Sequence, residues 1–215
     1  MIKLEKTSVM NFHNATRGAR NPMNSWEKSD SEFVEAENGY KEFRLGAADL
    51  KLLQNLVKSG SDHRKFMRQI FVSVDITAPL YWWKEFDTYK VGTVANSCST
   101  MHKLTHKQFE LDDFSKDRMS LPTQEVLECV IQHLELLRKH FLTTKDRQDW
   151  DDMIQLLPSS YNQLRTITMN YENVFNMYHA RKNHKLAEWR EGFTEWVESL
   201  PLARELITEV QSCDD

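Results

Sequence analysis

The sequence has little cysteine and no long apolar run. Its three cysteines, Cys98, Cys129 and Cys213, are far apart and form no CxxC pair. Such a sparse set argues against a disulfide framework and is typical of a reducing compartment. No stretch approaches the roughly 18 to 20 apolar residues that cross a bilayer, and MIKLEKTSVM lacks the apolar centre of a signal peptide. We therefore expect a cytoplasmic protein with no membrane segment.

The usual phosphate and metal motifs are also absent. The sequence contains no GxGxxG, no GxxxxGK[ST] and no HExxH. His102 and His106 could face one side of a helix, but no acidic third ligand has a matching spacing, so two surface histidines are the simpler interpretation and we expect no metal. The net charge of −4 gives no global electrostatic case for nucleic acid. Cys98 could act as a nucleophile only through distant residues, and a small buried cysteine is the commoner role.

Length and composition predict an ordinary globular protein. The chain has 215 residues, of which 28% are charged and 40% hydrophobic. A chain of this length buries roughly 70% of its unfolded surface, enough for a core of its own. We predict a single domain over residues 1–215.

The first half of the chain contains the strands. Residues 2–10 could form an edge strand, and the Asn- and Gly-rich stretch 11–46 predicts a loop with one short helix near Ser25 to Ser31. An amphipathic helix is expected over 47–59, ending at Gly60. The strongest strand signal covers 67–77, where β-formers alternate. Pro79 is expected in the first turn of a helix that runs to Tyr89, and residues 91–102 are expected to be extended or looping.

From Pro122 onward the pattern is helical. Apolar residues recur at three- and four-residue spacing, and the sequence predicts helices over about 122–141, 147–156, 161–182 and 184–200, with a short one ending near Val210. Repeated βαβ units are absent, so a parallel sheet is not expected. We predict an α+β fold with a small antiparallel sheet and a helical half.

An ordered series of residues carries a resemblance. His63 precedes the strand, Ala78-Pro79 leads into an aromatic helix that contains Trp82 and Trp83, and a polar loop NSCSTMH follows. Leu157-Pro158 is then followed by Asn170, Asn176, Arg181 and Ala187-Glu188-Trp189. Allowing one inserted residue near Ala95, this series resembles the flavin-dependent thymidylate synthases over about residues 47–195. The resemblance implies the α+β fold of the thymidylate-synthase-complementing type.

The series departs from the family mainly at arginines. Thr88-Tyr89-Lys90 stands where the family has Arg-His-Arg, and Glu85 stands where it has Gln. Ser97 replaces an acidic residue, and Met101, Ile154 and Glu172 replace arginines. Arginine makes bidentate, permanently charged contacts with phosphate, so Lys90, Lys103 and Arg181 compensate only in part.

The resemblance implies a cofactor, two groups of site residues and an assembly. The cofactor would be FAD, lined by His63, Thr88, Tyr89, Lys90, Asn96, Asn170 and Asn176. The nucleotide would be held by Glu85, Ser97, Cys98, Ser99, Thr100 and Arg181. The family makes dTMP from dUMP with methylenetetrahydrofolate and NADPH, with no enzyme nucleophile, and its members are homotetramers. Each residue also has a structural interpretation: Arg181 suits a helix C-terminus, and the asparagines and serines could be ordinary surface residues.

Three functions therefore remain open from the sequence. The first is a flavoprotein methyltransferase of the thymidylate synthase type. The second is a flavin enzyme that acts on another pyrimidine nucleotide, because changed hydrogen-bonding groups reject an old ligand strongly. The third is a non-catalytic homologue that kept the fold and lost the site. The paired residues Trp82 and Trp83 could serve either a subunit interface or the core.

Overall fold

The computed structural model describes residues 1–37 and 39–210, apart from the side chains of His102 and Lys103. Packing divides the chain into two compact units. Unit 1 comprises Met1–Glu5, Asp75–Thr88 and Ala95–Thr166, and unit 2 comprises Lys6–Val74, Tyr89–Val94 and Ile167–Asp215. Each unit is assembled from separate stretches of chain, and the prediction of a single domain over 1–215 stays a prediction.

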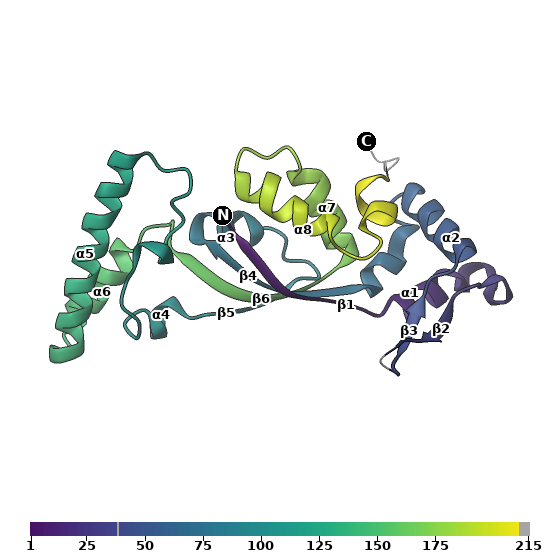
Figure 1. Ribbon diagram of the computed structural model, residues 1–215, viewed down its shortest axis with the longest axis horizontal. Helices are drawn as coiled ribbons and strands as arrows, with labels where there is room; N and C mark the ends of the chain where they lie inside the picture. The colour runs from purple at the N-terminus through teal and green to yellow at the C-terminus, as the bar shows by residue number, and fades with distance from the viewer. Residues whose placement is uncertain (38, 211–215) are drawn as a thin grey trace. The chain divides into compact units, whose positions relative to one another are not determined.

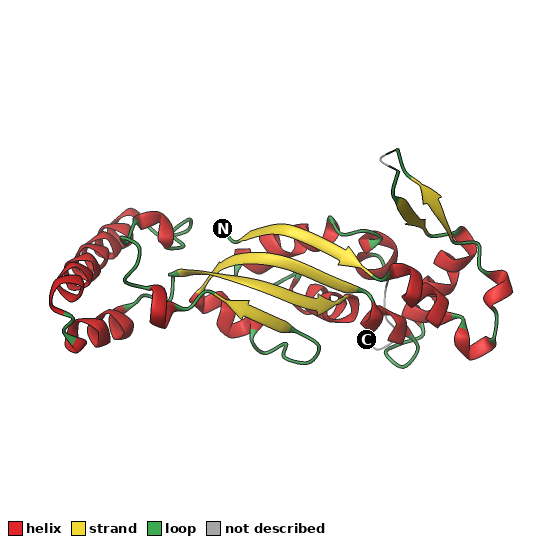
Figure 2. Cartoon of the chain, turned by 90° about the horizontal axis from the view of Figure 1, so that it is seen from below, coloured by secondary structure: helices red, strands yellow, loops and turns green. Residues whose placement is uncertain are grey.

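A four-stranded sheet has the order β1-β4-β6-β5 (Figure 2). The strands are β1 (Lys3–Met10), β4 (Phe71–Pro79), β6 (Asn162–Asn170) and β5 (Val94–Ser97). Side chains show that β4 and β6 are antiparallel, because the Ser73 hydroxyl lies 2.7 Å from that of Thr168 while Thr166 donates to Asp75 at 2.6 Å. The predicted edge strand at the N-terminus and the small antiparallel sheet are both confirmed.

The strand β6 corrects the sequence prediction. The pattern predicts a helix over 161–182, but residues 162–170 are extended and only α7 (Tyr171–Arg181) is helical. The run Thr166, Ile167, Thr168 consists of β-branched residues, which favour a strand that pairs with β4. Tyr171, Phe175 and Tyr178 of α7 are buried in the core.

The N-terminal stretch is more ordered than its composition predicts. It contains α1 (Phe12–Ala19), the 3₁₀ turns η1 (Asn21–Met23) and η2 (Trp26–Lys28), and a hairpin of β2 (Glu32–Glu35) with β3 (Lys41–Arg44). The sequence predicts only the short helix near residue 26. Contacts distant in sequence stabilise α1: Asn11 donates to the Gln69 carbonyl at 2.8 Å, and Phe12 packs edge-on against Tyr171. A prediction from local composition misses such contacts.

The middle of the chain follows the prediction with shifted boundaries. α2 (Ala47–Lys58) is confirmed and ends before Gly60, whose φ is +94°. The 3₁₀ helix η3 (Arg64–Gln69) occupies the start of the expected strand, so β4 begins at Phe71. Pro79 ends β4 and precedes α3 (Leu80–Phe86), which stops before Tyr89.

The tryptophans of α3 belong to the core. Trp82 is 0% exposed and Trp83 1% exposed within this chain alone. Trp82 stacks on Phe86, and the Trp83 indole donates to the Gln163 carbonyl at 3.0 Å. Of the two interpretations of this pair, the core is confirmed and the subunit interface is wrong, because neither side chain reaches the surface.

The remaining helices divide between the units (Figure 1). In unit 1, α4 (Thr100–Lys103) and η4 (Leu111–Asp113) precede α5 (Leu121–Thr144) and α6 (Arg147–Leu156), which pack on each other around Leu127, Leu134 and Met153. In unit 2, α7 packs against α8 (Thr194–Glu198) and η6 (Arg204–Thr208). The helix expected from 184 is instead a π-helical turn, η5 (Glu188–Phe193), followed by α8.

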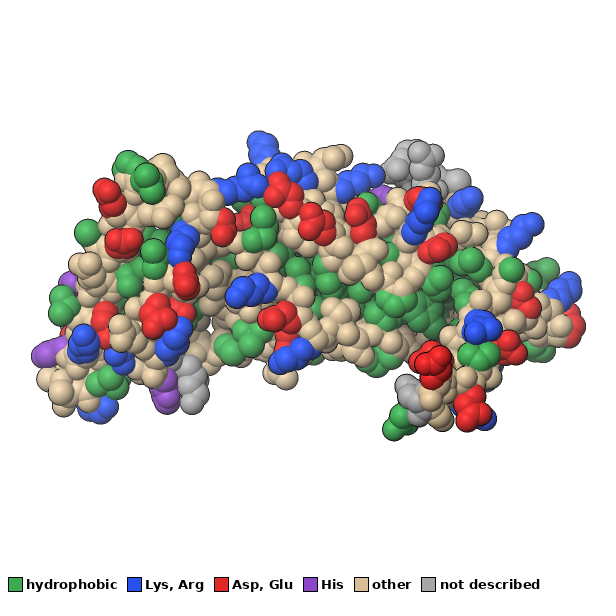
Figure 3. All heavy atoms as spheres, in the orientation of Figure 1, with side chains coloured by type: hydrophobic (Ala, Val, Ile, Leu, Met, Phe, Trp, Pro, Cys, Tyr) green, Lys and Arg blue, Asp and Glu red, His purple; other side chains and the backbone are tan. Residues whose placement is uncertain are grey.

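Charge and hydropathy add two observations. On the face shown in Figure 3, acidic and basic side chains are interspersed, so that face has no field of a single sign. Among the described helices, none is both long and apolar enough to cross a membrane.

Candidate functional site

The predicted site residues lie in both units. Unit 1 contains Glu85, Thr88, Asn96, Ser97, Cys98, Ser99 and Thr100, and unit 2 contains His63, Tyr89, Lys90, Asn170, Asn176 and Arg181. The unit 2 group is the more informative, because two of its members, Asn170 and Asn176, line a cavity.

This cavity has a volume of about 490 Å³ and lies at the N-terminal end of α7. Its walls come from η3 and the turn before it, from the loop after Lys90, and from the β6–α7 junction. They consist of Ser61, Arg64, Arg68, Val91, Gly92, Asn170, Glu172, Asn173 and Asn176. We call it the α7 cavity. It brings two predicted cofactor residues, Asn170 and Asn176, together with the two residues that follow Lys90.

The loop 89–94 approaches α7 closely at Gly92. Gly92 has a φ of +75°, and a Cβ atom there would lie 2.8 Å from Asn170 Nδ2 and 2.9 Å from Asn173 Oδ1. The Asn173 amide also donates to the Val91 carbonyl at 2.6 Å. Only glycine combines this backbone conformation with this proximity. Because Gly92 has no side chain, the backbone of the loop can lie directly against the amides of Asn170 and Asn173 in the wall of the α7 cavity.

Asn170 has a structural role that the sequence does not predict. It ends β6 and is the N-cap of α7, where its Oδ1 accepts from the Asn173 backbone amide at 2.9 Å. Asn173 accepts in turn from the Asn170 amide at 3.4 Å, which completes a capping box. The expectation that Asn170 lies within a helix is therefore wrong. The cap oxygen of Asn170 is committed, while its amide nitrogen faces Gly92.

Glu172 joins two arginines in the cavity wall. Its carboxylate accepts from Arg64 Nε at 3.3 Å and from Arg68 Nη2 at 3.3 Å, with a shorter contact to Arg68 Nε. Arg64 and Glu172 are 7% and 10% exposed, whereas Arg68 is 52% exposed. The hydrogen bond and charge of Glu172 raise the pKa of Arg68 above its ordinary value. One carboxylate thus offsets half of the positive charge in this wall.

Tyr89 and Arg181 meet at the other end of α7. Arg181 Nε donates to the Tyr89 hydroxyl at 2.9 Å, and the guanidinium carbon lies 5.2 Å from the centre of the Trp189 ring. Trp189 is fully buried in the π-helical turn η5. Cation–π contact and the hydrogen bond fix the orientation of the guanidinium. The position of Arg181 at the C-terminus of α7 is confirmed, and two aromatic residues hold it there.

Most of the unit 1 group lies at the end of the edge strand β5 and just after it. The Cys98 amide donates to the Leu164 carbonyl at 2.9 Å, and Gln163 donates to the Cys98 carbonyl at 2.7 Å, so β6 anchors this segment. Asn96, Ser97 and Cys98 are exposed, and Ser99 and Thr100 are half-buried. The expectation of a buried cysteine is wrong, because Cys98 lies at the end of a short, exposed edge strand. Thr88 is exposed and donates to the backbone carbonyl of half-buried Glu85 at 2.7 Å.

Two other predicted residues are exposed in unit 2. His63 is the residue before η3, and the walls of the α7 cavity include its neighbour Arg64 rather than His63 itself. Lys90 is exposed immediately before Val91. In the part of the chain that the structure describes, no group of three potential metal ligands occurs. His106 is exposed, and the side chain of His102 lies outside the described residues.

Sequence reasoning misses Ser61, Arg64, Arg68, Gly92 and Asn173. A signal exists for Asn173, because an Asn-x-x-Asn pattern at the start of a helix favours a reciprocal cap. Arg64 and Arg68 give no signal, since their partner Glu172 is more than 100 positions away. In the sequence, Glu172 stands out only as the replacement of an arginine.

No protein-family model matches this sequence, and no curated protein matches it. Solved structures do. Thymidylate Synthase X from Helicobacter pylori, with FAD and dUMP, has a TM-score of 0.73 at 15% identity and covers 98% of each chain. A second structure of this enzyme, the flavin-dependent thymidylate synthase complexed with FAD and dUMP, has a TM-score of 0.69 at 16% identity, covering 98% of this chain and 99% of the other.

A third solved structure is the UMP/dUMP methylase PolB from Streptomyces cacaoi bound with 5-Br dUMP. It has a TM-score of 0.60 at 13% identity and covers 96% of this chain and 94% of the other. The α+β architecture is thus that of a group of nucleotide-modifying enzymes. More specifically, the chain has the fold of the flavin-dependent thymidylate synthases, and the resemblance predicted from the sequence is confirmed at that level.

Proposed function

We propose that this chain is a flavin-dependent enzyme that methylates the pyrimidine of dUMP to give dTMP, with methylenetetrahydrofolate as carbon donor and NADPH as reductant. One observation carries the proposal. The loop 89–94 contacts both ends of α7, through Val91 and Asn173 at its start and through Tyr89 and Arg181 at its end. These are two segments that the family resemblance requires to converge.

The residues of the α7 cavity fit a flavin ring. A volume of about 490 Å³ falls within the roughly 300 to 1,000 Å³ of small-molecule sites. The Asn170 amide nitrogen can donate, and the Asn176 amide can both donate and accept, which suits the carbonyl and ring nitrogen atoms of an isoalloxazine. Gly92 allows the backbone to lie close to a planar ligand. FAD, when bound, would supply hydride chemistry that side chains cannot perform.

The other predicted residues would hold the ends of the ligands. Lys90 is an exposed cation next to Val91 and would attract a phosphate. Tyr89 and Trp189 would orient the Arg181 guanidinium for a bidentate contact with an anion. In unit 1, Ser97, Cys98, Ser99 and Thr100 would donate hydrogen bonds to the nucleotide phosphate, and Glu85 would face the pyrimidine edge. His63, Thr88 and Asn96 remain proposed cofactor contacts.

The proposal includes assembly and location. A homotetramer would allow a site to combine residues from several subunits, and the cytoplasm would supply the folate and nicotinamide substrates. Size-exclusion chromatography with light scattering tests the tetramer directly. A monomer at micromolar concentration that still turns over would contradict it.

A second candidate is the modification of another pyrimidine nucleotide. Glu85, which stands where the family has Gln, and the loss of arginines motivate it, because changed hydrogen-bonding groups at the nucleotide reject the old ligand strongly. The methylase PolB, named for UMP and dUMP, shares the fold. In this case FAD binds, while a nucleotide other than dUMP stimulates turnover.

The decisive experiment combines a spectrum with a substrate screen. The purified protein should be yellow, and added FAD should raise its melting temperature, since a ligand that binds only the native state stabilises it. NADPH oxidation is then measured with dUMP, UMP and dCMP in turn. Faster oxidation with dUMP supports the first function, and faster oxidation with another nucleotide supports the second. A colourless protein without an FAD shift would mean a non-catalytic homologue.

A further inference from the structure

Unit 2 has another cavity, which shares no lining residue with the α7 cavity. It has a volume of about 230 Å³ and lies between α1, the segment 26–31 and the hairpin β2–β3. We call it the hairpin cavity. Its walls combine aromatic rings, hydroxyl groups and arginines, and no part of the proposed flavin chemistry uses it.

The aromatic walls are held in fixed positions. Phe33 and Phe43 are directly opposite in the hairpin register, and their ring centres are 5.6 Å apart. The His13 ring of α1 packs against Phe33 at 5.3 Å. A hydrogen bond orients the Trp26 ring: its indole N–H donates to Asn21 Oδ1 at 2.8 Å.

These rings nevertheless remain open to solvent. Phe33 is 53% exposed and Trp26 is 51% exposed. Leaving large aromatic faces in water forgoes free energy that burial would provide. Rigid, half-exposed aromatic faces are the surfaces on which nucleobases stack.

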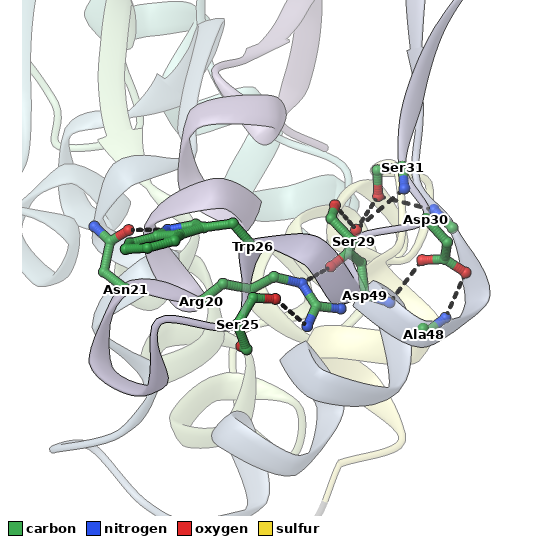
Figure 4. A network of polar contacts seen from close by, with 10 residues as sticks. Arg20, Asn21, Ser25, Trp26, Ser29, Asp30, Ser31, Ala48 and Asp49 are labelled. Carbon is green, nitrogen blue, oxygen red and sulfur yellow. Dashed lines mark hydrogen bonds and ion pairs between the residues drawn. The ribbon is translucent and has the colours of Figure 1, made fainter.

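A buried ion-pair network forms the rigid base of this region (Figure 4). Arg20 Nε donates to Asp49 Oδ1 at 2.5 Å, and Asp49 Oδ2 accepts from the hydroxyls of Ser29 at 2.6 Å and Ser31 at 2.5 Å. The Asp49 side chain is 0% exposed and that of Arg20 is 6% exposed. The network joins the end of α1, the loop 29–31 and the start of α2. A site with such support is preorganised and loses little entropy on binding.

The lining of the hairpin cavity includes an exposed cation. The Arg20 charge is offset by Asp49, but Arg17 is exposed and donates to the neutral amide of Asn14 at 3.3 Å. Because side chains alternate along a strand, Glu32 lies on the hairpin face opposite to Phe33. The cavity therefore presents a cation beside stacking surfaces.

The hydroxyl of Thr16 supplies a further polar group. Thr16 lines the cavity and is 2% exposed. Among the described residues its Oγ1 is one of the buried polar atoms without a hydrogen-bond partner. A buried hydroxyl left in this state is unfavourable, because it has given up its hydrogen bonds to water. Helical threonines use two rotamers, so a rotation about χ1 can turn this hydroxyl toward a ligand.

We propose that the hairpin cavity binds a nucleotide, with the base stacked on Phe33 and Trp26 and the phosphate on Arg17. The volume of about 230 Å³ is below the range of roughly 300 to 1,000 Å³ for drug-sized ligands, so it accepts one base rather than a dinucleotide. The proposal combines three observations: exposed aromatic rings, an exposed cation in the lining and a buried hydroxyl in the wall.

The test uses AMP and UMP as probes on the full chain, with adenosine and ribose 5-phosphate as the separated halves. Saturation-transfer NMR detects contact and calorimetry gives Kd. Both mononucleotides should bind, and adenosine should bind more weakly than AMP. Failure of both mononucleotides to bind at about 5 mM overturns the proposal, because even a weak site with a Kd of about 1 mM is mostly occupied at that concentration.

Two variants locate the site. Phe33→Leu keeps an apolar side chain against α1 but removes the stacking face, and it should weaken AMP binding at least about fivefold, the lower end of the effect of a stacked base. Arg17→Gln removes an exposed charge, and it should weaken AMP binding about tenfold while leaving adenosine binding unchanged, as loss of a charge-assisted hydrogen bond predicts.

Matched controls separate this site from others. Arg44→Gln removes an exposed cation from β3, and Asn176→Ala changes the α7 cavity. Neither variant should alter the binding of AMP to the hairpin cavity. If Asn176→Ala weakens AMP binding while Arg17→Gln does not, the nucleotide occupies the α7 cavity and the proposal is wrong. Melting temperatures without ligand show whether Phe33→Leu has unfolded the hairpin. If it has, the effect of Arg17→Gln on AMP binding tests the proposal on its own.

Discussion

The side-chain amide of Asn173 donates to the backbone carbonyl of Val91 at 2.6 Å, across 82 positions of sequence. This hydrogen bond holds the loop after Lys90 in contact with the first turn of α7. It explains why the two segments of the proposed flavin site lie together, although neither contains a recognised binding motif. Substitutions in this contact are therefore the most direct way to examine the site.

Gly92→Ala should impair FAD binding. An added Cβ would lie 2.8 Å from Asn170 Nδ2 and 2.9 Å from Asn173 Oδ1, so the loop must move away from α7. We expect at least about a tenfold loss of FAD affinity, because a displacement of about 1 Å in a positioning element is costly. Fluorescence titration of the flavin measures it.

The chain offers a matched control for this substitution. Gly39 also has a positive φ, +79°, but nothing lies within 4 Å of the place that an added Cβ would take. Gly39→Ala incurs the same backbone strain, about 1 to 3 kcal/mol, without the clash. If both variants bind FAD equally well, the α7 cavity does not hold the flavin.

Glu172 should stabilise the fold unequally through its two arginines. Arg64→Gln leaves a buried carboxylate that keeps only an exposed partner, and breaking a buried pair costs about 3 to 5 kcal/mol. Arg68→Gln removes a half-exposed charge, and exposed pairs contribute about 0 to 1 kcal/mol. Urea denaturation of the two variants gives both values. Equal losses would show that exposure does not determine the strength of these pairs.

How far the sequence predicts this molecule depends on where the signals lie. α2, α5 and α6 have apolar residues at helical spacing, so local pattern is sufficient. The pattern predicts a helix where β6 lies, because over so short a run the apolar positions fit both helical and strand spacing. Hydrogen bonding to β4 selects the strand. The same holds for the site: resemblance predicts Asn170, Asn176 and Arg181, whereas the partners of Glu172 come from η3 and are fixed only by the tertiary fold.

Asp49 should make stability depend on pH. Burial alone would raise the pKa of Asp49, but hydrogen bonds from Ser29, Ser31 and Arg20 outweigh burial and hold it below the ordinary 3.8. The unfolded chain therefore binds this proton first as the pH falls. The stabilisation is complete well above pH 3.8 and is lost as the pH falls through the lower folded value.

The measurement is the free energy of unfolding between about pH 6 and pH 2.5, a range that spans the usual titration of aspartate. Asp49→Asn should flatten the slope in the acidic part of this range. The difference between wild type and variant should persist at about 0.5 M salt, because buried charges are screened less than exposed ones. An identical slope in both proteins would contradict the assignment.

Tyr89→Phe should weaken nucleotide binding without unfolding the protein. The substitution removes the hydroxyl that accepts from Arg181 Nε at 2.9 Å, while the ring that packs near Trp189 remains. The guanidinium then has more orientations, and its contact with an anion loses part of its preorganisation. We expect KM for dUMP to rise about three- to tenfold, the effect of one hydrogen bond. Tyr40→Phe, at a 73% exposed position of the hairpin, is the control and should change neither KM nor Tm. An unchanged KM in Tyr89→Phe with FAD still bound would mean that Arg181 supports the fold of α7 and does not hold the nucleotide.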